Sequence, residues 1–225
     1  MIRLLWEEYK PACLELLKSL IDSSLEATNE LGSFTATNLY ILYPEDENIL
    51  KDILFKKALT SHQIKGICSC AQDLLKIKNT HDRANQIISE LTCQPKLEAE
   101  HLNGLFYDDC FVLPGDIELI QKIVATDPSE FYYSVGHYIE KNMDHLLELK
   151  EIIFFFCNHF AEDKPEHRHR RDYWSEKRLS SLVSSLYDAA ANQPQLVQRC
   201  LDTWDTLYEV NIGGAREQMQ KLLDT

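Results

Sequence analysis

The sequence predicts an all-α protein of stacked antiparallel helix pairs, the architecture of a HEAT-like α-solenoid. Three observations favour this class: apolar residues recur at steps of three and four, glycine and proline number only 7 each, and the predicted helix pairs begin at similar intervals. Scarce glycine and proline are typical of long helices with short connections and fit poorly with a turn-rich β architecture. An irregular helical bundle with similar loop spacing is the alternative.

The first predicted helix carries an apolar stripe that faces the core. This stripe is formed by Leu14, Leu17, Ile21 and Leu25. Pro11 is expected at a bend, because proline inside a helix removes a hydrogen bond and clashes with the preceding turn. Gly32 and Ser33 are expected to end this element, so that residues 34–43 form a packed loop or a short helix.

Later helices are marked by their first turns. Acidic residues follow Pro44, where the helix dipole favours negative charge, and Ser61 is a plausible cap for the next helix. The clearest local signal is Asp127-Pro128-Ser129-Glu130, because a cap aspartate, a proline at the first helical position and a glutamate at the third resemble a capping box. The helix after it is expected to reach about Phe160, with a break near Asn142.

The predicted helix pairs recur along the chain. They begin near Ser61, Gln94, Asp127 and Asp172, at separations of 33, 33 and 45 residues. Such spacings are the period of α-solenoids, in which each unit buries its apolar face against its neighbours. We therefore expect one helical-repeat domain over residues 1–225, and the polar segment 162–172 is where a subdivision would fall.

The charge of the chain is acidic and unevenly distributed. The formal net charge is -13; residues 1–162 carry 14 Lys/Arg against 26 Asp/Glu, whereas residues 163–178 carry 6 against 4. A net acidic surface repels phosphate, which argues against a general nucleic-acid binder.

The cysteines and the apolar runs indicate a cytoplasmic protein. The seven cysteines are an odd number, and several of them, such as Cys13 and Cys200, occupy apolar helix positions instead of a disulfide framework. Residues 1–8 have no apolar core of signal-peptide length. The longest apolar run, residues 152–157, is far shorter than the roughly 20 residues that span a bilayer. We expect no membrane association.

Two groups of residues invite a zinc interpretation. Cys68 and Cys70, with Cys93 and Cys110, have the wrong spacing, because residues two apart point to different sides of a helix. Buried thiols that act as small apolar side chains explain them as well.

The second group brings four ligand types close together in sequence: Cys157, His159, His167 and His169. Cys157 lies in an apolar run and should face the core, and the two later histidines stand among arginines that oppose a divalent cation. The sequence therefore predicts no metal site, no cofactor and no small-molecule ligand.

The basic stretch 164–171 is the most informative polar feature. Its arginines are followed directly by two aromatic residues, and the resulting set predicts a contact surface: Arg168, Arg170, Arg171, Tyr173 and Trp174. Arginine beside aromatic residues suits an acidic protein surface, either on a partner or on the acidic half of this chain itself. It also suits phosphate and stacked bases, so a nucleic-acid-associated helical protein stays as the alternative. A third interpretation is that the stretch is a solvent-exposed loop.

Catalysis is not expected. His137, Glu140 and His145 share a predicted helical region, and imidazole–carboxylate neighbours occur in catalytic sites, although such spacings more often give surface pairs. Phosphate-binding glycine loops, a nucleophile elbow and the zinc-protease helix motif are all absent from the sequence. A helical metalloprotein or enzyme built on these residues, or on the Cys157 group, is the second alternative.

Residues 179–186 and 192–208 resemble a HEAT-type helix pair. The resemblance lies in the aliphatic first helix, the Asn192-Gln193-Pro194 turn and the Leu-Val stripe after it. This region is similar to the end of helical-repeat regions that close large bacterial NTPases, including some in antiphage defence. It covers about the last 45 residues, and its motif is generic. Because the chain lacks a nucleotide-binding module, the resemblance implies a sensor or scaffold portion and not an activity.

The sequence thus predicts a non-catalytic scaffold or sensor that binds protein partners or self-associates. It would stand alone or form the C-terminal part of a larger bacterial assembly.

Overall fold

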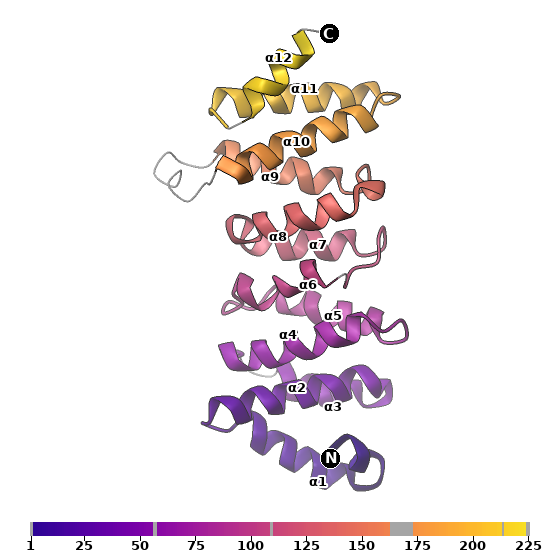
Figure 1. Cartoon of the computed structure of the whole chain (residues 1–225). Coiled ribbons are helices and arrows are strands. Elements are labelled where there is room, and N and C mark those ends of the chain that lie inside the picture. The colour runs from indigo at the N-terminus through magenta and orange to yellow at the C-terminus, as the bar shows by residue number, and fades with distance from the viewer. Residues whose placement is uncertain (1, 56–57, 109, 163–172, 213, 224–225) are drawn as a thin grey trace. The chain divides into compact units, whose positions relative to one another are not determined.

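The computed structural model describes residues 2–55, 58–108, 110–162, 173–212 and 214–223, and for residues 173–175 and 222–223 it describes the backbone alone. These residues form twelve α-helices and three 3-10 helices and contain no strand, which confirms the all-α prediction (Figure 1). The α-helices are α1 (Ile2–Ile21), α2 (Glu26–Leu42), α3 (Glu47–Phe55), α4 (Ser61–Leu75), α5 (His81–Leu91), α6 (Gly104–Tyr107), α7 (Ile117–Thr126), α8 (Pro128–Lys141), α9 (Lys150–Glu162), α10 (Tyr173–Ala189), α11 (Pro194–Glu209) and α12 (Ala215–Leu223). The 3-10 helices are η1 (Pro44–Asp46), η2 (Ala99–His101) and η3 (Met143–His145).

The helices form two compact units. The N-terminal unit comprises Met1–Val112 and Glu118–Thr126, and the C-terminal unit comprises Leu113–Ile117 and Asp127–Thr225. In the N-terminal unit α2 packs on α1, α3 and α4, and α4 packs on α5. In the C-terminal unit α9 packs on α8, α10 and α11, and α12 packs on α10 and α11. The solenoid arrangement stays a prediction. The subdivision at 162–172 also stays a prediction, because most of that segment lies outside the described residues.

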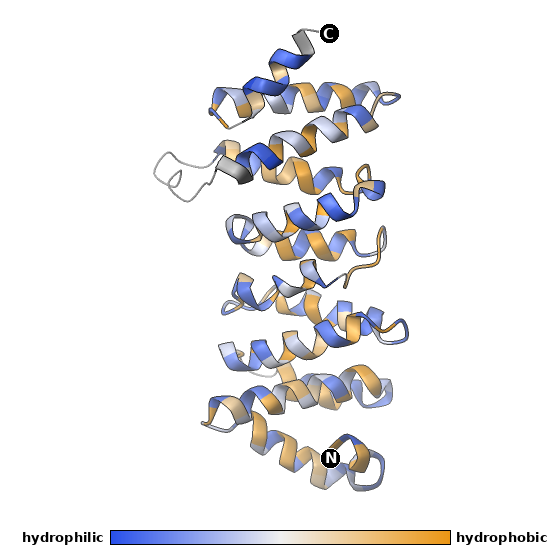
Figure 2. Cartoon of the chain, in the orientation of Figure 1, coloured by the Kyte–Doolittle hydropathy of each residue, from blue (hydrophilic) through white to orange (hydrophobic). Residues whose placement is uncertain are grey.

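Each unit buries the apolar faces of its helices. Figure 2 shows apolar residues concentrated on particular sides of the helices and polar residues on others. Fully buried side chains include Ile64, Ile67 and Leu50 in the N-terminal unit and Phe131, Val135 and Ile153 in the C-terminal unit. Burying such a side chain stabilises the fold by about 1.5–3 kcal/mol relative to leaving it exposed. Among the described residues, no helix is both long and apolar enough to cross a membrane.

Helix α1 bends where the sequence predicts it. Tyr9, two residues before Pro11, leaves the helical region with φ -127° and ψ 35°. Proline cannot donate its backbone nitrogen and its ring displaces the carbonyl of the preceding turn, so the bend falls just before it. The prediction for Pro11 is confirmed.

The expected end of the first element near Gly32 is wrong. Helix α2 runs through residues 26–42 without interruption, and Leu25 is the residue before it and is exposed instead of extending the stripe of α1. Gly32 allows α1 to approach closely, because a Cβ there would lie 2.8 Å from the Ile21 nitrogen. Thr37 satisfies its hydroxyl by donating to the Ser33 carbonyl at 2.8 Å. Tertiary packing therefore overrides weak helix propensity in this segment.

Helix α4 begins at Ser61, the predicted cap residue, and its actual cap lies one residue earlier. Thr60, not Ser61, is the N-cap: its hydroxyl accepts from the Gln63 backbone nitrogen at 3.3 Å, and the Gln63 side chain accepts from the Thr60 nitrogen at 2.9 Å. This reciprocal pair is a capping box. Farther along α4, Gly66 lets the helix touch α2, since a Cβ at this position would overlap the Glu30 carbonyl oxygen.

The start and end of α8 confirm two predictions. Asp127 is the N-cap, and its carboxylate accepts from the Glu130 backbone nitrogen at 3.3 Å, with Pro128 in the first turn. The helix stops at Lys141, and the Asn142 side chain donates to the Tyr138 carbonyl at 2.8 Å. The long predicted helix is therefore two helices, α8 and α9, as the expected break near Asn142 implied.

Candidate functional site

The predicted contact residues fall at the edge of the described chain. Arg168, Arg170 and Arg171 lie outside the described residues, whereas Tyr173 and Trp174 begin α10 and only their backbone is described. Their assignment to a contact surface therefore stays a prediction.

Of His137, Glu140 and His145, the residues considered for catalysis, Glu140 and His145 have partners outside this group. Glu140 accepts from the Arg178 Nε at 2.9 Å, and Arg178 lies across the Tyr133 ring at 5.0 Å from its centroid. His145 lies 3.7 Å from a carboxylate oxygen of Glu148. Arg178 thus forms a bridge from α10 to α8 and uses the Glu140 carboxylate for it.

The thiols considered for zinc are mostly in the core. Cys68, Cys70 and Cys110 are buried, whereas Cys93 is exposed. Burial raises the pKa of Cys68 and that of Cys70 to about 12 each, so both thiols keep their protons at neutral pH. A protonated thiol is a poor metal ligand and a poor nucleophile. Cys68 and Cys70 therefore behave as small apolar side chains.

In the second group considered for zinc, which has Cys157 and three histidines, the thiol is again in the core. Cys157 is buried, and burial raises its pKa strongly, with Cys200 nearby adding to the shift. His167 and His169 lie outside the described residues.

His159 contacts a serine that the sequence did not point to. Its Nε2 lies 3.2 Å from the hydroxyl of Ser129, in the first turn of α8. A hydroxyl next to an imidazole is one arrangement of a nucleophile and its general base, but a third group must orient the base and the pair must face a cleft. Ser129 is exposed, and the hollow described below does not include it. We interpret the pair as a surface contact between α8 and α9.

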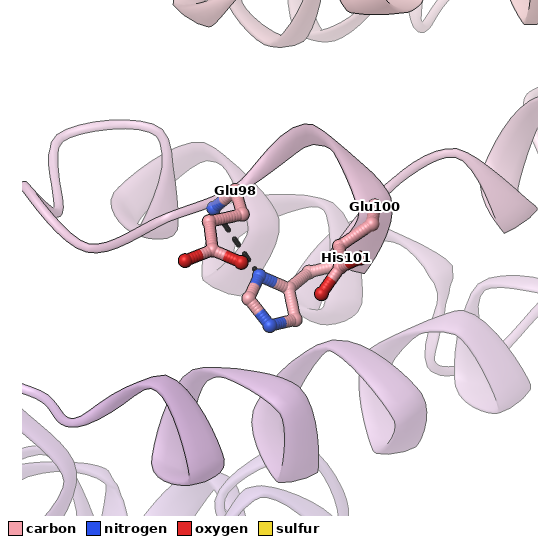
Figure 3. A group of neighbouring side chains, drawn as sticks. All are labelled: Glu98, Glu100 and His101. Atoms are coloured by element: carbon pink, nitrogen blue, oxygen red, sulfur yellow. Dashed lines mark hydrogen bonds between the residues drawn. The ribbon is translucent and has the colours of Figure 1, made fainter.

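Three side chains around η2 could in principle share a cation. Oxygens of Glu98 and Glu100 and a ring nitrogen of His101 lie within 4.8 Å of one another (Figure 3). However, the His101 Nδ1 accepts a hydrogen bond from the Glu98 backbone nitrogen at 3.2 Å, as half of a capping box. The lone pair of the imidazole is thus already engaged, and both carboxylates are exposed to water. Helix capping accounts for this arrangement.

A concave surface lies in the N-terminal unit, where the end of α1, α3 and the start of α4 form a hollow. Its volume is about 420 Å³. Aliphatic and polar residues line it: Lys18, Ile21, Asp22, Ile49, Asp52, Ile53, Leu54, Leu59 and Gln63. The two aspartates and the lysine are exposed at its rim, and Ile49 is 44% exposed. We call this surface the N-terminal hollow.

A polar cluster holds the walls of the N-terminal hollow together. The carbonyl of Ile21, at the end of α1, accepts from the side-chain amides of Asn29 and Gln63, the latter at 3.3 Å. Gln63 also belongs to the capping box that starts α4. One amide side chain therefore ties the end of α1 to the beginning of α4, and it satisfies a carbonyl that the helix itself leaves without a partner.

The lining of the N-terminal hollow suits binding better than bond-making chemistry. Among its residues there is no histidine, cysteine, serine or tyrosine. Asp22 and Asp52 are exposed to water, so they lack the desolvation that tunes catalytic carboxylates. An aliphatic floor with charges at the rim is instead typical of a socket for an apolar side chain with polar neighbours.

The sequence carries no local signal for the N-terminal hollow. Its residues come from three short stretches, 18–22, 49–54 and 59–63, that look like ordinary amphipathic helix positions. Only the packing of α1, α3 and α4 brings them together.

Comparison with known proteins gives no further assignment: no family model matches the chain, and neither a curated protein nor a solved structure matches it. The HEAT-type resemblance of the C-terminal residues accordingly stays a prediction.

Proposed function

We propose that this protein is a non-catalytic helical scaffold that binds protein partners. The N-terminal hollow is the observation that carries the proposal: an aliphatic surface depression with charged residues at the rim and no nucleophile or imidazole in its lining. Such a surface gains free energy when an apolar side chain of a partner displaces its water.

The sequence adds to this proposal a second contact surface, a cellular compartment and a larger assembly. The stretch 164–174 has the arginine and aromatic residues that are enriched where proteins meet. The reduced, mostly buried thiols fit a cytoplasmic scaffold. Stacked helix pairs, and a place at the C-terminal end of a larger bacterial, defence-type assembly, are narrower proposals that rest on the helix spacing and on residues 179–208 alone.

The experiment is a pull-down with the full chain, quantified by mass spectrometry. Ile49→Glu puts a charge at the rim of the N-terminal hollow, and because Ile49 is 44% exposed the fold should tolerate the change. Ile77→Glu is the matched control, since Ile77 is 50% exposed and does not line the hollow. Reversal of Arg168, Arg170 and Arg171 to glutamate tests the second surface.

We expect at least one protein captured reproducibly by the wild type and by Ile77→Glu to be lost with Ile49→Glu or with the arginine reversal. If all captured proteins are the same for every variant, neither surface binds partners. If the wild type captures nothing and carries a hydrolytic activity, the scaffold proposal is wrong.

A further inference from the structure

We propose that the N-terminal hollow of one copy of this chain receives the basic, aromatic stretch 164–174 of a second copy, so that copies associate head to tail. This inference rests on the proposed scaffold function and names its partner.

The receiving surface is apolar in its floor and acidic in its surroundings. Ile21, Ile53 and Leu54 are among the aliphatic residues of the floor, and the rim has two carboxylates, Asp22 and Asp52, against one ammonium. The wider region keeps this sign: residues 1–57 contain 6 Lys/Arg and 10 Asp/Glu, a net of -4. The surface therefore favours an occupant that combines apolar side chains with positive charge.

The chain carries such an occupant in its own sequence. Within 164–174, Arg168, Arg170 and Arg171 supply three positive charges, and Tyr173 and Trp174 follow within three residues. Arginine, tyrosine and tryptophan are the residue types that most often dominate binding energy at protein interfaces. A guanidinium can also make two parallel hydrogen bonds to a carboxylate such as Asp52.

The charge distribution favours this arrangement over one in which two N-terminal hollows pair with each other. Pairing two N-terminal hollows face to face would set a region of net -4 against itself, which costs electrostatic free energy. A contact between two different surfaces has no such repulsion. It also leaves one hollow and one basic stretch unused at the two ends of any open assembly, so association should continue beyond the dimer or close into a ring.

The experiment is a charge exchange between copies, followed by sedimentation velocity. One variant reverses the occupant (Arg168→Glu, Arg170→Glu and Arg171→Glu), and the other reverses the rim (Asp22→Arg and Asp52→Arg). Each variant alone sets like charges against each other and should stay monomeric at concentrations where the wild type forms a salt-sensitive series of oligomers. An equimolar mixture of the two variants should associate again, because the reversed charges are complementary.

A matched control reverses two exposed aspartates that do not line the hollow, Asp73→Arg and Asp205→Arg, and should associate like the wild type. Circular dichroism checks that each variant is folded. As a second measurement, a fluorescent peptide of residues 163–175 is titrated with the full chain. We expect Ile49→Lys, which removes an apolar side chain and sets a like charge against the arginines, to weaken its binding about tenfold or more, whereas a peptide with the same residues in scrambled order binds weakly to both proteins.

The inference is overturned if the wild type is monomeric at all concentrations and does not bind the peptide, or if the mixed variants fail to associate. If the chain is monomeric but Ile49→Glu still removes a captured protein, the inference fails and the scaffold function stands. If association persists in the rim variant, a different surface holds the copies together.

Discussion

The two units of the molecule use charged residues in different ways. In the N-terminal unit the carboxylate of Asp46 is buried, with 6% of its surface exposed, and it accepts hydrogen bonds from the Trp6 indole at 2.8 Å and from Lys10 at 2.7 Å. In the C-terminal unit Arg199 and Glu151 form a two-bond ion pair at 2.7 and 2.9 Å with both side chains about half exposed.

Two further arginines, one in each unit, are buried to the same extent, with 20% of each side chain exposed. Arg83 in the N-terminal unit donates to the Tyr40 carbonyl near the end of α2, at 2.6 Å, and to Glu47 at 3.1 Å. It thereby joins α2, α3 and α5 in a mostly buried position. Arg178 in the C-terminal unit likewise joins two helices, α10 and α8, through its contacts with Tyr133 and Glu140.

The difference between the buried Asp46 contact and the half-exposed Arg199–Glu151 pair indicates where a single substitution should destabilise the fold most. A buried polar contact that loses one member leaves the other desolvated and without a partner, which costs several times more than a lost surface ion pair. The N-terminal unit, which carries the N-terminal hollow, should therefore be the more sensitive of the two.

The largest effect is expected from Gly66→Ala. The new methyl group would overlap the Glu30 carbonyl oxygen, so α2 and α4 must separate, and the free energy of unfolding should fall by about 3 kcal/mol or more. Gly136→Ala in α8 is the control: its methyl meets the flexible Arg178 side chain at 2.8 Å, and alanine favours the helix, so its change should stay within about 1 kcal/mol. Urea denaturation of both variants measures this, and equal losses would contradict the contrast.

The next effect is expected from Asp46→Ala, at about 2–3 kcal/mol, because Trp6 and Lys10 lose their shared acceptor. The effect should also depend on pH. Burial by itself would raise the pKa of Asp46, but the hydrogen bonds from Lys10 and Trp6 outweigh burial, and the pKa lies below its ordinary value of 3.8. The stabilisation is therefore complete above that value and is lost as the pH falls through the lower, folded-state pKa.

The direction of this pH dependence is tested by measuring the free energy of unfolding at neutral pH and again in acid. The difference between the wild type and Asp46→Asn should shrink as the medium is acidified below pH 3.8. A difference that grows in acid would mean that the carboxylate does not stabilise the fold in its charged form.

The smallest effect is expected from Arg199→Ala in the C-terminal unit. The hydrogen bonds from Arg199 lower the pKa of Glu151, but both side chains are about half exposed, so solvent screens the pair. A double-mutant cycle with Glu151→Ala should give a coupling free energy of about 0.2–1 kcal/mol. The guanidinium also lies 3.8 Å above the Phe154 ring, and Arg199→Lys separates that stacking contact from the charge. A coupling as large as the Asp46 effect would remove the distinction between the two units.

Local signals in the sequence predict the parts of the fold that local physics determines. Asp127 and Pro128 fix the start of α8, Pro11 fixes the bend of α1, and Asn142 ends α8, all as expected. The continuous helix through Gly32 could not be predicted, because glycine is there for close contact with α1 and this contact is visible only in three dimensions.

The candidate site was less predictable than the fold. The sequence points to Arg168 and Trp174 through local composition, and the structure leaves this stretch untested. The N-terminal hollow depends on residues from α1, α3 and α4 that have no local signal in common. Contacts between distant segments determine such a surface, so periodicity and capping cannot reveal it.

The most direct test of the account locates binding on the surface. In a full chain labelled at its isoleucine methyl groups, addition of the unlabelled peptide of residues 163–175 should shift the NMR signals of Ile21, Ile49 and Ile53, which line the N-terminal hollow. The signals of Ile77 and Ile123, which do not line it, should stay in place. Shifts that are absent, or that spread evenly over the isoleucines of both units, would contradict a partner-binding N-terminal hollow.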